Sequence, residues 1–334
     1  MRANKATVLT FAEKCKSLLS SNWQGQLNTI KADAKGSKED IYRSKVKYIC
    51  KRGKPYIWVP EKELHNVNVI VDERSSFAVA NPIPGPLASL LKSIKKSPAR
   101  VALIGDVVPL TDAKVKSATE VLKEVILTEQ KAISESSYTV SGILSSSDHS
   151  CTSRSENLKE VLEGDEKYIV YKFNQRQEPL FLDAVSKSLF KCYSGRNVHV
   201  PGSCMYVDGN GDTHEIDQED MNASKADPLA LLSAKLIDGI NQSAARRRAL
   251  MLFCLTYFNT NAKDAYMLSI DRKGFEVLSK VPSPALKDGY GQFQWKQFRL
   301  SLKEEARDVE SFCRQLVEME EEAVKEVSGH SGLA

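Results

Sequence analysis

The stretch DIYRSKVKYICKRGKPYIWVP, residues 40–60, constrains the fold more than any other part of the chain. β-Branched and aromatic residues flank a KRGKP turn, in which Gly53 and Pro55 favour a tight reversal of the backbone. Two strands joined by so short a turn must run antiparallel. Similar strand patterns occupy residues 25–32, 75–80 and 100–110. The first part of the chain is therefore expected to form an antiparallel sheet or barrel.

Helical patterns lie before and after these strands. Apolar residues recur at helical spacing over residues 8–19, where the continuous apolar segment of a secretory signal does not occur. Residues 61–73 are expected to form a short helix, and residues 111–133 a long one that begins at a Thr-Asp cap. Residues 134–156 are so rich in serine that a mobile loop is predicted there.

The segment VDGNGDTHEIDQE, residues 207–219, has some features of a calcium loop. Asp208, Asn210, Asp212 and Glu219 stand at the first, third, fifth and twelfth positions of such a loop. A calcium loop also needs a preceding helix and a glycine at the sixth position, where this chain has Thr213 and strand-forming residues before it. The Asp-Gly and Asn-Gly pairs are typical of hairpin turns, and we predict a hairpin.

The last third of the chain has a different pattern. Residues 217–241 and the run RRRALMLFCLTYFN are expected to be helices, residues 265–281 a hairpin, residues 291–300 a third strand, and residues 301–327 a final helix. We therefore divide the chain into a barrel domain at 1–216, a small α+β domain at 217–327 and a flexible tail at 328–334.

Composition narrows the classes of function. Lys and Arg exceed Asp and Glu by only four, so charge indicates neither a nucleic acid nor an anionic membrane as the partner. The most apolar run, residues 249–258, is about half of the roughly 20 residues needed to span a bilayer. Seven scattered cysteines without a CxxC pair argue against a zinc cluster and for reduced thiols, which favours the cytoplasm.

Few residues have the spacing of a catalytic or metal site. No two of the five histidines are three or four residues apart, as in a helical metal site. No Gly-rich phosphate loop or nucleophile elbow occurs, which argues against a Rossmann nucleotide site. In HNVNVIVDERSSF, one helical turn aligns His65 with Asn68 and brings Arg74 to the next strand. These polar groups either face a ligand or bond a helix end to a loop.

Three segments, taken in order, carry a family resemblance. HNVNVIVDERSSFAV is followed by RVALIGDVVPL, and later by DMNASKADPLALL with LSIDRKGFEVL. The first two resemble the His-x-x-Asn, acidic-Arg-Ser and Gly-(Asp/Glu)-Val-x-Pro-Leu signatures of the split β-barrel family of flavin-binding pyridoxamine 5′-phosphate oxidases, in particular its HugZ-like haem-utilisation branch. The third is similar to the small domain that follows the barrel in that branch and in plant glutamyl-tRNA-reductase-binding proteins.

The resemblance implies an α+β fold, with an antiparallel split β-barrel and flanking helices followed by a small α+β domain. It makes residues 175–202 an insertion between two barrel strands, predicted to be loosely packed. It further implies a homodimer that binds a tetrapyrrole, haem, in a cleft between the barrel and its partner, and that supports oxidative cleavage as haem oxygenases do.

The resemblance also singles out site residues. A tail histidine ligates the iron in the bacterial haem-degrading relatives, which points to His330, with His65 as the second choice. Arg43, Arg74 and Arg100 are the expected partners of the haem propionates. In place of the family's His-Met-Asn-x-Asp-His, residues 220–225 of this chain read DMNASK, which lacks both histidines. No metal role is therefore carried over to that segment.

Two alternatives stay open. An FMN-dependent oxidoreductase would hold the phosphate and ribityl groups with Arg43, Ser44, Lys45 and Lys47, although Asn68 stands where flavin-using members have a basic residue. A non-catalytic scaffold would instead regulate an enzyme of tetrapyrrole synthesis, as the plant relatives do. A plastid and the surface of the endoplasmic reticulum remain alternatives to the cytoplasm.

Overall fold

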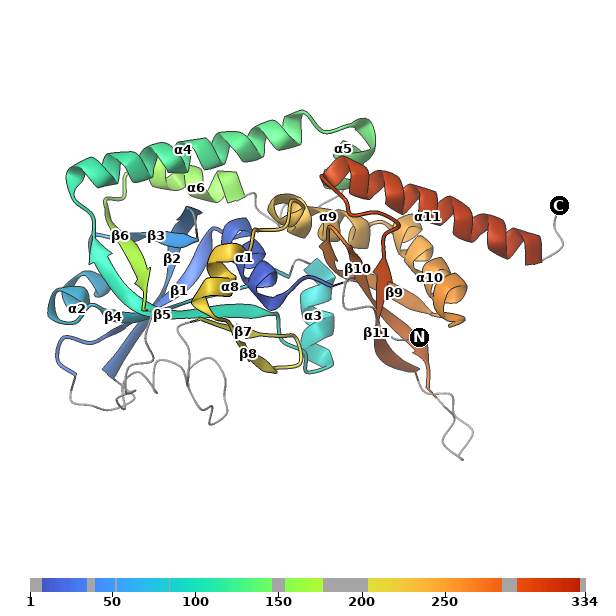
Figure 1. The fold of residues 1–334 in the computed structure, drawn as a ribbon, viewed down its shortest axis with the longest axis horizontal. Helices are drawn as coiled ribbons and strands as arrows, with labels where there is room; N and C mark the ends of the chain where they lie inside the picture. The colour runs from blue at the N-terminus through green and yellow to red at the C-terminus, as the bar shows by residue number, and fades with distance from the viewer. Residues whose placement is uncertain are drawn as a thin grey trace.

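The computed structural model describes residues 8–34, 40–51, 53–83, 85–145, 154–176, 204–283 and 293–330. A β-barrel lies at one side of the molecule and a three-stranded sheet with helices at the other, and the long helix α4 (Asp112–Ser134) runs along the barrel toward the second part (Figure 1). The predicted α+β class with an antiparallel barrel is confirmed. Within these ranges, no helix is long and apolar enough to cross a membrane. Nearly all of the predicted insertion at 175–202 lies outside them.

Six antiparallel strands close the barrel. They are β1 (Gln24–Ile30), β2 (Ile41–Lys51), β3 (Lys54–Pro60), β4 (Arg74–Ala80), β5 (Arg100–Pro109) and β6 (Tyr168–Gln175), in the order β4-β1-β2-β3-β6-β5, with β5 pairing back to β4. The predicted hairpin is β2–β3, and Gly53 in its turn has a φ of +78°, which glycine adopts without strain. One edge of β5 pairs with β4. On its other edge, the end of β5 pairs with β6 and the start of β5 pairs with β7 (Cys204–Val207).

The hairpin predicted at residues 207–219 is also present. Strand β7 continues into β8 (Thr213–Glu215), and the two strands pair in antiparallel fashion. The carboxylate of Asp208 accepts hydrogen bonds from the backbone N–H groups of Asn210 and Asp212, at 2.9 and 3.0 Å. Gly211 has a φ of +90°. Asp208, the first residue of the apparent calcium loop, therefore holds the turn together with its carboxylate.

Alternating residues of the strands fill the barrel interior. Leu27, Tyr48 and Phe77 are fully buried there, and the rings of Tyr48 and Phe77 meet edge to face with centroids 4.9 Å apart. Helix α1 (Phe11–Ser21) adds Cys15 and Leu19 to this core. Helix α2 (His65–Val71) lies on the opposite side of the barrel from α1 (Figure 1).

The serine-rich stretch is not the loop that its composition predicts. Residues 138–144 form helix α5 (Tyr138–Leu144), which the Ser137 hydroxyl caps, and residue 154 begins helix α6 (Arg154–Glu163). Val140 and Ile143 are buried in the core of the second part of the molecule. The packing of a few apolar residues at helical spacing against this core thus stabilises a helix in spite of the polar composition. Residues 146–153 lie outside the described chain.

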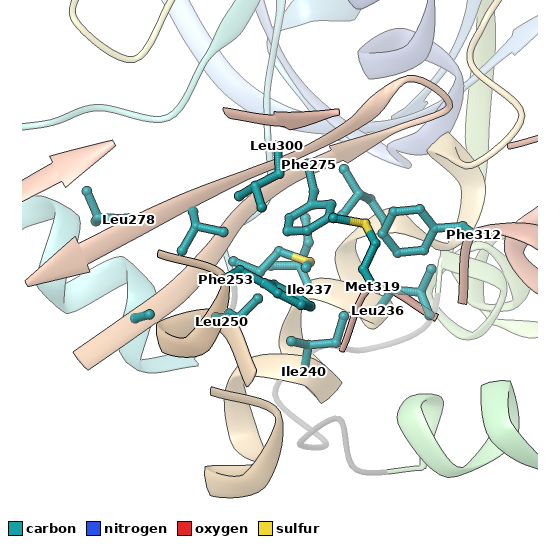
Figure 2. Packing of buried hydrophobic residues seen from close by; sticks show 14 of the residues in the cluster. Leu236, Ile237, Ile240, Leu250, Phe253, Phe275, Leu278, Leu300, Phe312 and Met319 are labelled. Carbon is teal, nitrogen blue, oxygen red and sulfur yellow. The ribbon is translucent and has the colours of Figure 1, made fainter. Parts of the chain in front are cut away.

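The second part of the molecule combines a sheet with helices. Its elements are α8 (Gln218–Ala223), α9 (Ala230–Gln242), α10 (Ala244–Phe258), β9 (Asp264–Asp271), β10 (Gly274–Pro282), β11 (Phe293–Ser301) and α11 (Val309–His330), with the sheet order β11-β10-β9. Phe253, Phe275, Phe312 and Met319 meet in its core (Figure 2). Helix α3 (Gly85–Ser93) and α5 also contribute residues to this core, so it is not built from the C-terminal third alone.

Two helix predictions in this part are wrong in detail. Residues 217–241 form two helices rather than one, because Pro228 lies between them and cannot continue a hydrogen-bonded helix. The last helix begins at Val309 rather than at 301, since Ser301 completes strand β11. It then continues to His330, so residues 328–330 belong to the helix and not to the predicted tail.

Candidate functional site

The motif histidine is held inside the barrel. His65 is the first residue of α2, and none of its side chain is exposed. Its Nδ1 lies 2.8 Å from the Thr29 hydroxyl and its Nε2 lies 3.1 Å from the Ser44 hydroxyl. Burial lowers the pKa of His65 to about 4, so the ring is neutral at physiological pH. Because both ring nitrogens already have partners, this arrangement leaves no nitrogen for a metal.

The asparagines of the same helix fasten it to the barrel. The Asn68 side chain accepts a hydrogen bond from the Ala32 backbone N–H and donates one to the Thr29 hydroxyl, both at 3.0 Å. Asn66 donates to two backbone carbonyls of the preceding turn and accepts from the Tyr171 hydroxyl at 2.9 Å. Buried amides need such partners. Asn68 therefore has a structural role that a phosphate-clamping basic residue could not fill.

The motif arginine is paired within its own turn. The Arg74 guanidinium contacts both carboxylate oxygens of Asp72, with an Nη2–Oδ2 distance of 2.6 Å. Arg176 forms a second such pair with Asp106, which stands opposite Arg74 in the β4–β5 register. Burial by itself would raise the pKa of Asp72, but hydrogen bonds from Arg74 hold that pKa below its ordinary value. A propionate would have to displace a carboxylate to reach Arg74.

The second motif, GDVVPL, positions strands. A Cβ on Gly105 would lie 2.2 Å from the backbone oxygen of Asn174, so only glycine lets β5 and β6 approach at this point. Asp106 holds Arg176 as described above, and Pro109 ends the strand before α4 begins. The residues of both motifs thus hold elements of the barrel together.

The remaining predicted residues do not converge. Along β2, Ser44 points to His65 inside the barrel, while Arg43 and Lys45 are exposed on the outer face. Lys47 forms an ion pair of 2.6 Å with Glu160 of α6. Arg100 stands at the start of β5, beside β4 and β7. The four residues proposed for FMN are therefore divided between two faces of the strand.

His330 and His65 lie at opposite ends of the molecule. His330 is the last residue of α11, which runs away from the barrel, whereas α2 covers the far side of the barrel (Figure 1). The two histidines of one chain therefore cannot serve one ligand. His330 could reach a barrel site only in another subunit.

A cavity of about 490 Å³ lies between the barrel and the second part of the molecule. Leu87, Leu91 and Ile270 form part of its apolar lining, and His214 of β8 also borders it. The His214 ring stacks on Phe11 with centroids 3.8 Å apart, and its Nε2 lies 3.9 Å from a carboxylate oxygen of Asp208. Within the described residues, neither ring nitrogen of His214 has a hydrogen bond.

Two ammonium groups border the same cavity. Lys14 lies over the rings of Phe11 and Tyr206, 5.3 and 6.0 Å from their centroids. Lys96 donates to the side-chain oxygen of Gln297 at 2.9 Å. Neither lysine has a carboxylate partner in the described part of the chain. The cavity thus combines apolar walls with an imidazole and two lysines, and Arg299 and four carboxylates also line it.

The four carboxylates of this cavity already have donors. Asp271 is paired with Arg299 at 2.7 Å, and Asp227 with Arg272. Asp208 accepts from the backbone of its own turn, and Glu276 accepts from the side chains of Ser269 and Gln297. Sequence reasoning did not find His214, because it stands in a Thr-His-Glu strand without ligand spacing. Its neighbours Phe11 and Lys14 are about two hundred positions away in the sequence. Only the packing of α1 against β7 and β8 brings them together.

Comparison with solved structures identifies the fold. No protein-family model matches the chain, and no curated protein matches it in sequence. The heme binding protein of Mycobacterium smegmatis matches with a TM-score of 0.50 and 17% identity, over 95% of this chain and 99% of that one. A putative pyridoxamine 5′-phosphate oxidase of Listeria innocua and HutZ, the heme storage protein of Vibrio cholerae, each match half of this chain at 10% identity, with TM-scores of 0.30 and 0.28, over 95% and 86% of their own lengths.

The match to the Mycobacterium smegmatis protein includes both the barrel and the second part of the molecule. The chain therefore has the split-barrel fold followed by a smaller α+β part, as the resemblance of its motifs implied.

Proposed function

We propose that this chain binds a tetrapyrrole, haem, and that it does so as a homodimer. The observation that carries the proposal is the fold, which nearly the whole chain shares with a protein named for heme binding. The cavity between the barrel and the second part offers the groups that haem uses. At about 490 Å³, its volume falls within the range of roughly 300–1,000 Å³ for small-molecule sites.

The side chains of this cavity fit haem in their chemistry. His214 would bind the iron, and Asp208 would orient its ring by accepting a hydrogen bond. Lys14 and Lys96 would neutralise the two propionates, because neither has a competing carboxylate in the described chain. Bound haem would supply the redox chemistry of iron. His65 does not enter this proposal, since both of its nitrogens have hydrogen-bond partners.

A haemin titration followed by absorption spectroscopy tests this proposal. The wild type should give a saturable Soret band, and His214→Ala should weaken binding and shift the band. His330→Ala is the matched control and should leave both unchanged. If His330→Ala alone alters the spectrum, a partner's tail supplies the iron ligand and the cavity assignment is wrong. The absence of any saturable band contradicts haem binding itself, and flavin released by heating the purified protein would favour the oxidoreductase instead.

Haem degradation requires a separate assay. The haem complex is incubated with ascorbate and catalase in air, so that electrons and oxygen are supplied and free peroxide is removed. A haem-degrading enzyme loses the Soret band and releases iron under these conditions. A complex that keeps its spectrum binds haem without cleaving it.

The outer face of α2 supports a dimer. Val67, Ile70 and Val71 of this seven-residue helix and Leu64 just before it are 54 to 84% exposed, although all four are apolar. We assign this face to the second subunit. Light scattering should give the mass of a dimer for the wild type and of a monomer for Ile70→Asp, whereas Val324→Asp on α11 should remain dimeric. A monomeric wild type would exclude this part of the proposal.

A further inference from the structure

Two buried cysteines from distant parts of the sequence meet in the barrel core. Cys15 belongs to α1 and Cys204 begins β7, and neither side chain is accessible to solvent. Both carry free thiols and belong to the same apolar cluster. The side chain of Cys15 is hydrogen-bonded to that of Cys204, and this bond, together with burial, raises the pKa of Cys15. The fold thus places two thiols in contact.

The packing of α1 against β7 explains this contact. The centroids of the Phe11 and Tyr206 rings are 5.6 Å apart, and the Lys14 ammonium lies 6.0 Å from the centroid of the Tyr206 ring. Cys15 stands four residues after Phe11 on the same helix face, and Cys204 stands two residues before Tyr206 on the same strand face. One helical turn advances about 5.4 Å and two strand residues about 6.6 Å. The ring pair and the thiol pair are therefore neighbouring contacts of one interface.

The cavity that His214 borders brings small molecules close to the thiols. Phe11 and Leu18 line this cavity from the helix face that carries Cys15, and Tyr206 lines it from β7. Neither cysteine lines the cavity itself. A small movement of these side chains would therefore admit a small oxidant to the thiols but exclude a bulky one.

We propose that Cys15 and Cys204 form a reversible disulfide when the protein meets a peroxide. One cysteine attacks hydrogen peroxide as its thiolate, which breaks the O–O bond, releases water and leaves a sulfenic acid. The second thiol attacks the oxidised sulfur, forms the S–S bond and releases a second water. The two thiols together lose two electrons and two protons, and the peroxide is reduced to two waters. A small thiol such as glutathione restores the reduced pair by exchange.

The disulfide would fix one wall of the cavity. It ties α1 to β7, so Phe11 and Lys14 would stay beside His214 even when the rest of the interface opens. The bond closes a long loop and so restricts the unfolded chain, which stabilises the folded protein. Disulfides in reducing compartments are usually transient and redox-sensing, which agrees with a thiol pair that is reduced at rest. The inference concerns the core behind the cavity and does not rest on the tetrapyrrole proposal.

Peptide mapping by mass spectrometry tests the inference on the full chain. The wild type and variants are treated with hydrogen peroxide, denatured with N-ethylmaleimide to block the remaining thiols, and digested without reduction. Cys15→Ser and Cys204→Ser are the test variants. Cys254→Ser is the matched control, since Cys254 is equally buried but its Sγ lies 2.9 Å from the Ser279 hydroxyl.

Peroxide should produce a peptide pair linked through Cys15 and Cys204 in the wild type and in Cys254→Ser, and dithiothreitol should remove the link. The oxidised wild type should also unfold at a higher urea concentration than the reduced protein, whereas peroxide should not raise the urea midpoint of either test variant. The inference is overturned if the treated wild type shows no link between these two residues, or if it links Cys15 to Cys50 instead. The map of the wild type decides the question even if a test variant does not fold.

Discussion

The buried histidine of the barrel predicts a specific acid sensitivity. The ordinary pKa of the His65 imidazole is 6.5, which applies to the unfolded chain, and burial lowers it to about 4 in the folded protein. Between these values only the unfolded chain binds the proton, so the contribution of His65 to stability is complete above about pH 6.5 and is lost as the pH falls toward 4. A pH of about 5 lies roughly 1.5 units below the pKa of the unfolded ring and above that of the folded ring. Protonation of the unfolded chain therefore lowers the free energy of unfolding by about 2 kcal/mol at this pH.

Urea denaturation followed by circular dichroism measures this effect. The free energy of unfolding is determined at about pH 7.5 and about pH 5 for the wild type, His65→Gln and Thr29→Val. His65→Gln should lose about 2 kcal/mol less than the wild type between the two pH values, because glutamine does not titrate. Thr29→Val keeps the imidazole and its burial, so it should retain the acid sensitivity even though it loses a hydrogen bond.

Two results would refute this reasoning. One is an equal loss of stability in the wild type and His65→Gln. The other is a ring titration of His65 by nuclear magnetic resonance with a midpoint near 6.5, because such a midpoint would mean that burial does not disfavour the charged ring. The second measurement uses the wild type and remains decisive if His65→Gln does not fold.

Three further substitutions test the packing between the parts. Arg272→Met removes the ion pairs to Glu13, Asp227 and Glu305 and should lower the free energy of unfolding by about 2 kcal/mol; an unchanged urea midpoint would contradict this. Gly239→Ala would place a Cβ 2.0 Å from the Ile143 carbonyl and should destabilise by about 1–3 kcal/mol, whereas Gly142→Ala meets nothing within 4 Å and should be neutral or stabilising. Val140→Ser should cost about 2 kcal/mol and expose residues 137–145 to limited proteolysis, and an unchanged digestion pattern would count against an ordered α5.

Local patterns predicted most of the strands but not their closure. The β2–β3 hairpin follows from alternating residues and one glycine turn, and β5 from a run of β-branched residues. The pairing of β3 with β6 joins residues more than a hundred positions apart, and no property of either strand alone specifies it. The resemblance to a known family supplied this closure. Helix α5 was missed for a related reason, since the surface that buries Val140 comes from distant elements.

The site was harder to predict than the fold. The motif residues His65, Asn68 and Arg74 were found, but their partners Thr29 and Asp72 turn them inward or neutralise them. His214 was not found, because it is unremarkable among its own neighbours in the sequence. Its significance depends on which charges and rings the fold brings near it.

The roles of the motif residues change where function should be sought. His65, Asn68 and Gly105 fasten α2 and β6 to the barrel, and their replacement would disturb folding whether or not a cofactor binds. Such motifs are therefore expected in any chain in which α2 and β6 are attached to the barrel in this way. They predict the fold better than they predict a cofactor. Asp220 and Lys225, which replace the two family histidines, are exposed, where side chains can change without loss of stability. It follows that a ligand is best sought where the fold gathers polar groups outside these motifs, as it gathers His214, Lys14 and Lys96 at the cavity between the barrel and the second part of the molecule.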